Sequence, residues 1–186
     1  MKILYYDLET TGLLPNKNSI HQLGYIFEID DEIVEQGNIL MQPNPKAEIS
    51  LDALKVANKT LEDLAGYQSF NDGYKEFSSM LKRHIDPFDK TDKAFLCGFN
   101  NAAFDNQFLR GLFLQNNDQY FGSMFWSSTL DVMVIATQAL IHQRHEMPNF
   151  KLKTVAKWVG LNVDENLLHD AMYDIQLTRD IYKLIG

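Results

Sequence analysis

The sequence predicts an α/β protein in which a mixed five-stranded sheet is flanked by helices. The chain opens on an apolar run, Lys2–Leu8, that ends in a Thr-Thr-Gly turn and has the pattern of a buried strand. Two further runs, Gln22–Ile29 and Ile33–Gln42, lie on either side of Asp30-Asp31 as the strands of a hairpin do. Later in the chain strands alternate with helices, and three early strands followed by this alternation favour a mixed sheet.

The elements directly after the hairpin follow from turn residues and helical spacing. Pro43 and Pro45 end the hairpin pattern, and Thr60–Asp63 has the form of a capping box at the start of a helix. The next amphipathic helix is predicted from apolar residues at helical spacing, namely Phe70, Tyr74, Phe77, Leu81 and Ile85.

The second half of the chain supplies the other two strands. Ala94–Phe99 is the predicted fourth strand and leads into a helix. A short strand near Phe125–Leu130 precedes a helix over Val132–Ile141, and two more helices close the chain. No internal repeat, low-complexity tract or composition shift marks a linker, so we expect a single domain over residues 1–186.

Two carboxylates lie one residue apart at the end of the first predicted strand. Alternate strand residues point to the same face about 6.6 Å apart, so Asp7 and Glu9 direct two acids at one place. Like charges this close repel and raise each other's pKa unless a cation lies between them. A divalent cation that prefers oxygen ligands suits such a pair. Taken alone, the pair is equally compatible with the start of a polar turn.

Two further acids fall on the packed faces of predicted helices. Asn101 is suited to cap a helix on which Asp105 shares a face with apolar residues, namely Phe108, Leu109 and Leu112. Asp174 lies on the packed face of the C-terminal helix, which Asp170 can cap. An isolated ionised carboxylate on such a face must be neutralised, hydrogen-bonded or bound to a metal. His169 lies about 140° from Asp174 on an ideal helix, so the two share a site only if His169 belongs to the preceding loop.

Three motifs, taken in order, resemble those of the DEDDh 3′→5′ exonuclease superfamily, which includes proofreading exonucleases, ribonuclease T and oligoribonuclease. They are Asp-x-Glu-Thr-Thr-Gly from Asp7, Asn-x-x-Phe-Asp ending at Asp105, and His-x-x-x-x-Asp from His169 to Asp174. Each motif alone is weak, but three in order span nearly the whole chain. A sister group has Tyr four residues before the last Asp, where this chain has Asp170, so the chain resembles the His branch. The resemblance implies a ribonuclease H-like fold.

The resemblance also implies a cofactor and a reaction. Two Mg²⁺ or Mn²⁺ ions would be held by Asp7, Glu9, Asp105 and Asp174, with Asp7 shared between them. His169 would take a proton from the attacking water, and the product would be a nucleoside 5′-monophosphate released from a 3′ end. The residue types independently favour oxygen-preferring cations over zinc, because the chain has one cysteine and no Cys/His cluster of zinc spacing.

Substrate contacts are implied at three positions. Family members use the residue after the motif Glu, here Thr10, to contact the terminal sugar, and wedge an apolar residue, here Leu13, between the last two bases. Turn chemistry and core packing are the alternative explanations for these two residues. Asn101 completes the predicted substrate-binding set. Many members carry His-Asn where this chain has Asn100-Asn101, which leaves the contact with the terminal nucleotide open.

Composition limits the partners and the compartment. The net charge of −8, from 17 basic and 25 acidic residues, argues against binding nucleic acid by bulk attraction, although an enzyme that binds strand ends needs few phosphate contacts. Between positions 142 and 157 only Glu146 opposes the basic residues Arg144, Lys151, Lys153 and Lys157, which form either a path for the strand or a solvated helix face and loop. No run reaches membrane-spanning length, and the lone Cys97 forms no intramolecular disulfide, so we expect an intracellular, cytoplasmic protein without a membrane partner.

The sequence therefore predicts a metal-dependent 3′→5′ exonuclease for single-stranded ends, with DNA favoured over RNA. An RNA-trimming exoribonuclease or an oligoribonuclease is the alternative within this class. Outside it, the alternatives are a catalytically silent end-binding or polymerase-docking module and a metal-free hydrolase with a carboxylate pair, such as a glycosidase. A polymerase partner or a homodimer is left open.

Overall fold

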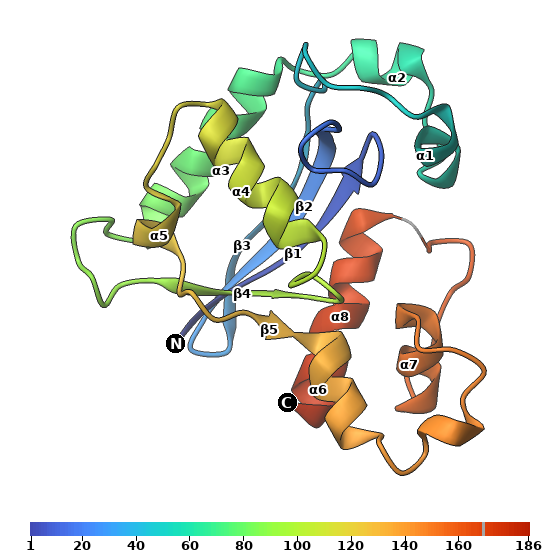
Figure 1. Ribbon diagram of the computed structural model, residues 1–186. Coiled ribbons are helices and arrows are strands. Elements are labelled where there is room, and N and C mark those ends of the chain that lie inside the picture. Colours follow the sequence, from blue (N-terminus) through green and yellow to red (C-terminus); the bar gives the residue numbers. More distant parts are fainter. Residues whose placement is uncertain (169) are drawn as a thin grey trace.

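A five-stranded mixed sheet forms the centre of the computed structural model, which describes residues 1–168 and 170–186 (Figure 1). The strand order is β3-β2-β1-β4-β5. The strands are β1 (Lys2–Thr10), β2 (Ile20–Ile29), β3 (Glu32–Leu40), β4 (Ala94–Gly98) and β5 (Leu130–Asp131). Strands β1, β2 and β3 pair antiparallel, whereas β4 pairs parallel with both β1 and β5. The predicted mixed five-stranded sheet is confirmed.

Helices cover both faces of this sheet. In chain order they are α1 (Leu51–Val56), α2 (Leu61–Ala65), α3 (Phe70–His84), α4 (Asp105–Gln115), α5 (Phe121–Met124), α6 (Val132–Ala139), α7 (Leu152–Trp158) and α8 (Ala171–Ile185), with a 3₁₀ turn at Arg144–Glu146. Helices α3, α4 and α5 pack on one face around Phe77 and Phe113, and α6, α7 and α8 pack on the other around Val155 and Ile175. Helices α1 and α2 lie beyond the strand ends, near the start of α8 (Figure 1).

The loop before α4 differs from its prediction. Asn101 does not cap the helix, because α4 begins at Asp105 and Phe104 precedes it without a side-chain cap. Asn100 has a φ of 64°, and the loop is instead held by Asp131, whose carboxylate accepts hydrogen bonds from the backbone N–H groups of Asn100 (3.0 Å) and Ala102 (3.1 Å). This packing also explains why the fifth strand is only two residues long, since Asp131 leaves the sheet to cap α6.

Two further predictions concern the start of α2 and the fifth strand. The capping box at Thr60 is present, with Asp63 and Thr60 bonding each other's backbone N–H groups. The strand predicted near Phe125–Leu130 forms only at its end, as β5 (Leu130–Asp131), and its start contributes a single bridge between Phe125 and Ala94. No helix in the described part of the chain is both long and apolar enough to cross a membrane.

Candidate active site

Asp7 and Glu9 lie on the face of β1 that packs against α8. Asp7 is paired with Gly24 of β2, and a Cβ placed on Gly24 would lie 2.7 Å from Ile175 and 3.1 Å from the Ala171 side chain. The α8 backbone therefore passes directly over this part of the sheet. The register shifts between Glu9 and Thr10, where a bulge ends the regular pairing.

Asp105 and Asp174 are brought to the same region by the first turns of two helices. Asp105 opens α4 and is buried, with 5% of its surface exposed. Asp174 lies in the first turn of α8, whose N-cap Asp170 accepts hydrogen bonds from Met172 (3.0 Å) and Tyr173 (3.1 Å). Asp7 and Glu9 each interact electrostatically with both of these carboxylates. The four acids predicted from three separate motifs thus lie close enough to interact through their charges.

The electrostatics of this cluster oppose ionisation. Burial raises the pKa of Asp7 well above its usual range, and the charges of Asp105, Glu9 and Asp174 raise it further. Burial, followed by Asp174 and Asp105, raises the pKa of Glu9 to about 7, while Lys59 acts in the opposite direction. Burial raises the pKa of Asp105 to about 7 despite a hydrogen bond from the Leu8 N–H. Removing this penalty requires a proton or a cation.

This donor set suits a hard divalent cation. It consists of carboxylate oxygens from β1, α4 and α8, which are the ligands that Mg²⁺ and Mn²⁺ prefer. Within residues 1–168 and 170–186, no three acidic or histidine side chains are already arranged as ligands of a single ion. Cation binding would therefore draw these carboxylates closer together against their mutual repulsion.

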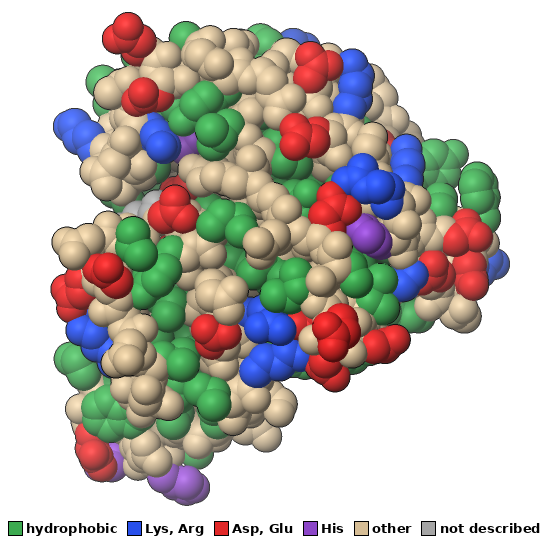
Figure 2. Space-filling view, turned by 180° about the vertical axis from the view of Figure 1, so that it is seen from behind, with side chains coloured by type: hydrophobic (Ala, Val, Ile, Leu, Met, Phe, Trp, Pro, Cys, Tyr) green, Lys and Arg blue, Asp and Glu red, His purple; other side chains and the backbone are tan. Residues whose placement is uncertain are grey.

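A hollow adjoins Asp174 at the edge of the molecule. It is lined by Asn149, Lys151, Leu152, Lys153, Thr154, Leu168 and Asp174. Figure 2 shows a notch at the left edge of the molecule, with acidic side chains beside it and basic side chains above it. Lys153 and Lys157 pair with Glu165 at 2.7 and 2.6 Å, and Arg144 stacks on Phe150. Of the basic residues predicted to line a strand path, Lys151 is the one that borders this hollow without such a contact in the described residues.

The predicted substrate-binding residues differ in exposure. Thr10 is nearly buried, and its hydroxyl donates to the Gly12 carbonyl at 2.8 Å. Leu13 is 77% exposed in the turn after β1 and is free to contact a ligand. Asn101 is fully buried and donates to the Thr129 hydroxyl at 2.9 Å, so its assignment to substrate binding stays a prediction. His169 lies outside the described residues.

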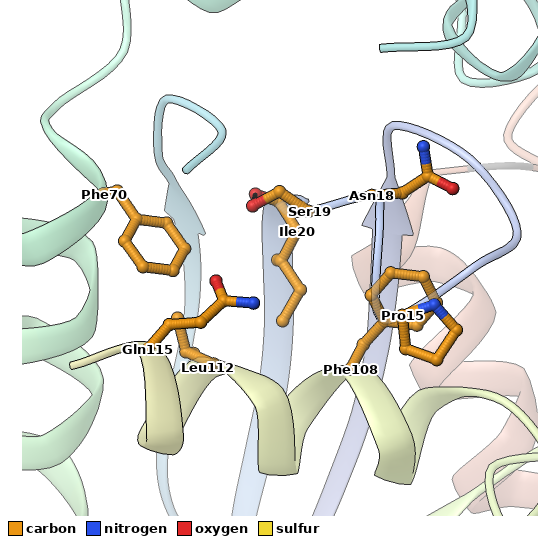
Figure 3. A pocket seen from close by; sticks show the side chains of 8 residues that line it. All are labelled: Pro15, Asn18, Ser19, Ile20, Phe70, Phe108, Leu112 and Gln115. Carbon is orange, nitrogen blue, oxygen red and sulfur yellow. Dashed lines mark hydrogen bonds between the residues drawn. The ribbon is translucent and has the colours of Figure 1, made fainter. Parts of the chain in front are cut away.

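A separate pocket lies on the other side of the sheet. Figure 3 shows it between α4 and the turn that follows β1, with Ile20 pointing toward the helix; its lining is Pro15, Asn18, Ser19, Ile20, Phe70, Phe108, Leu112 and Gln115. Because Leu8 and Ile20 belong to the core on the α4 side while Asp7 and Glu9 face α8, this pocket is not part of the carboxylate cluster.

Two residues of the site were not predicted from the sequence. Asp131 holds the loop before α4, and its charge also raises the pKa of Asp105. Its position directly before the apolar start of α6 is an N-cap signal that could have identified it. Lys59 acts on Glu9 from the α1–α2 connection, and no local pattern indicates that contact.

A known protein family matches nearly the whole chain. The model of the RNase T family, described as exonuclease, matches residues 4–182. The PolC-type DNA polymerase III of Mycoplasmopsis pulmonis is 27% identical over 179 residues, and exodeoxyribonuclease I of Buchnera aphidicola is 26% identical over 200 residues. The alignments cover 96% and 100% of this chain but only 11% and 39% of those proteins.

The similarity extends to solved structures. The crystal structure of E. coli exonuclease I in complex with a dT13 oligonucleotide superposes with a TM-score of 0.78 at 19% identity. The match covers 99% of this chain and 40% of that one. The predicted ribonuclease H-like fold is confirmed.

Proposed function

This chain belongs to the exonuclease family, and we propose that it is a metal-dependent 3′→5′ exonuclease releasing nucleoside 5′-monophosphates from single-stranded nucleic acid. The observation that carries the proposal is that three separate elements bring Asp7, Glu9, Asp105 and Asp174 into one region, where their charges act on one another. Cations bound between these acids would compensate their mutual repulsion.

In this proposal the four carboxylates hold two Mg²⁺ or Mn²⁺ ions, with Asp7 shared. When bound, such ions would stabilise the attacking and leaving oxygens of an in-line displacement. His169 accepts the proton of the attacking water, a task suited to an imidazole near neutral pH. Thr10 and Leu13 contact the terminal nucleotide, and Asn101 completes that contact or fixes the loop that carries Asp105.

Single-stranded DNA is the favoured substrate. The relatives are named for DNA synthesis and DNA degradation, and the E. coli neighbour is bound to an oligodeoxynucleotide. RNA trimming is the second candidate, because Asn100 stands where many members carry His, and this leaves the contact with the terminal nucleotide and the substrate preference open. The PolC-type relatives favour a polymerase as partner. We further propose that residues 1–186 form one domain and that the protein acts inside the cell.

The decisive experiment follows 5′-labelled DNA, RNA and dinucleotides with Mg²⁺, Mn²⁺ or EDTA. We expect a metal-dependent ladder that shortens from the 3′ end. Asp7→Asn keeps the side-chain volume and removes the shared ligand, so turnover should fall on the order of 10²–10³-fold. Asp180→Asn is the matched control, since Asp180 lies on α8 outside the cluster and should retain activity.

Other outcomes separate the alternatives. Near-normal turnover by a folded Asp7→Asn protein would remove the shared-ligand assignment. Activity that survives EDTA would favour a metal-free hydrolase. A wild-type protein that binds metal and strand ends but cleaves no substrate would be a binding module.

A further inference from the structure

The segment that carries α1 and α2 is attached to the turn after β1. The Ser50 N–H donates to the Thr11 carbonyl at 2.8 Å, and the Thr11 hydroxyl donates to the Glu48 carbonyl at 2.9 Å. Thr11 is two residues beyond Glu9, so these bonds fix the start of α1 directly beside the carboxylate cluster. Figure 1 shows both helices above the start of α8.

The backbone at Lys59 is held as the chain reverses between these helices. Asn58 adopts a φ of 52°, and the Lys59 N–H donates to the Leu54 carbonyl at 2.9 Å. Thr60 then starts α2 with a complete capping box. Lys59 therefore projects from a connection that is held by a hydrogen bond to α1 before it and by the capping box of α2 after it.

The Lys59 ammonium lies within electrostatic reach of the ends of two strands. It interacts electrostatically with Glu9 of β1 and with His21 of β2, and it opposes protonation of both. His21 is fully buried and burial already lowers its pKa, so it stays neutral and does not compete for an anion. Among the described residues Lys59 forms no ion pair, whereas Lys55 of α1 pairs with Asp52 at 3.2 Å.

Resting on the proposed function, we propose that Lys59 binds the phosphate backbone of the strand where its 3′ end enters the carboxylate cluster. Four carboxylates balance two divalent cations, so an incoming phosphodiester adds a negative charge that the cluster leaves uncompensated. An ammonium that interacts with Glu9 supplies the missing positive charge in a protein whose net charge is −8.

The test is the salt dependence of binding. Fluorescence anisotropy with a labelled oligothymidylate in an Asp7→Asn background reports binding without cleavage. For single strands, log K changes by about −0.7 per log unit of salt for each neutralised phosphate. Lys59→Met should make that slope shallower by about 0.7 and weaken binding on the order of fivefold at low salt. Lys59→Arg should restore both.

Lys55→Met is the matched control, because Lys55 lies on the same segment and is already paired with Asp52. It should leave the slope unchanged, and both variants should unfold at the same temperature. An unchanged slope in Lys59→Met, in a parent that binds with a clear salt dependence, would overturn this inference alone. A parent that does not bind single strands would overturn the proposed function and this inference together.

Discussion

Asp7 is surrounded by three other carboxylates, and each of them makes its ionisation more costly. Glu9 and Asp105 share that condition, with pKa values raised to about 7 from 4.5 and 3.8. A carboxyl group whose pKa is higher in the folded state stabilises the fold below the unfolded pKa, and this contribution is lost as the pH rises through the folded pKa. Ionisation of these buried carboxyl groups therefore lowers the free energy of unfolding at neutral pH.

In EDTA, we expect the free energy of unfolding to fall between pH 4.5 and about 7. Glu35 and Glu165, whose pKa values are lowered to about 2, change little in that window, whereas buried His21, whose pKa is lowered to about 4, opposes part of the fall because it must stay neutral in the folded protein. Asp7→Asn should raise the free energy of unfolding by about 1–2 kcal/mol at pH 8 and leave it nearly unchanged at pH 4. Mn²⁺ should stabilise the wild type at pH 8 more than Asp7→Asn.

Urea denaturation at the two pH values measures these effects, with Asp180→Asn as the control. A difference in stability between Asp7→Asn and the wild type that is the same in EDTA at pH 4 and pH 8 would contradict the raised pKa of Asp7, because the contribution of His21 cancels in that difference.

For single residues, the sequence predicts the surroundings of a side chain when these depend on the strand or helix that contains it. Strand alternation places Asp7 and Glu9 on one face, and the helical pattern anticipates the burial of Asp105 although the helix begins later than expected. Lys59 could not be anticipated, because its approach to Glu9 depends on a chain reversal and on hydrogen bonds to a distant turn. Non-local contacts of this kind leave no periodic signal.

Among the elements, α8 determines how close Asp174 comes to β1. One attachment is ionic: Glu28, 1% exposed on β2, accepts hydrogen bonds from Arg179 (2.8 Å) and Lys183 (2.7 Å) of α8. The other is steric, because Gly24 provides the space in which Ala171 and Ile175 pack on the sheet. This approach could not be predicted from the sequence, because a glycine within a strand pattern indicates only that a bulge or another backbone is near.

Gly24→Ala tests the close approach of α8. The added methyl group would lie 2.7 Å from Ile175 and 3.1 Å from Ala171, both in the helix that carries Asp174. We expect a loss of about 1–3 kcal/mol in the free energy of unfolding and reduced metal-dependent turnover in the protein that remains folded. Urea denaturation and single-turnover cleavage measure the two effects.

Gly111→Ala is the matched control for this substitution. Gly111 lies within α4, and the nearest atom to an added Cβ is at 3.8 Å. Alanine there should stabilise the protein by about 0.4–1 kcal/mol without affecting turnover. Equal stability of the Gly24→Ala and wild-type proteins would mean that α8 has room to move.

For the whole molecule, the two hydrophobic clusters share one sheet. The cluster on the α3–α4 side uses Leu4, Tyr6 and Leu8 of β1, and the cluster on the α8 side uses the intervening Ile3 and Tyr5. If β1 left the sheet, the buried side chains of both clusters would be exposed to water. The carboxylate cluster lies at the end of the same strand, so its geometry depends on both.

Residues 1–186 should therefore unfold in a single cooperative transition. Met80 and Ile181 are fully buried in opposite clusters, and truncation of each to alanine should cost about 2–5 kcal/mol. Because the clusters share β1, both variants should lower one common melting temperature, with equal calorimetric and van't Hoff enthalpies. A variant with two transitions, only one of them shifted, would divide the chain into separate units and contradict the single-domain proposal.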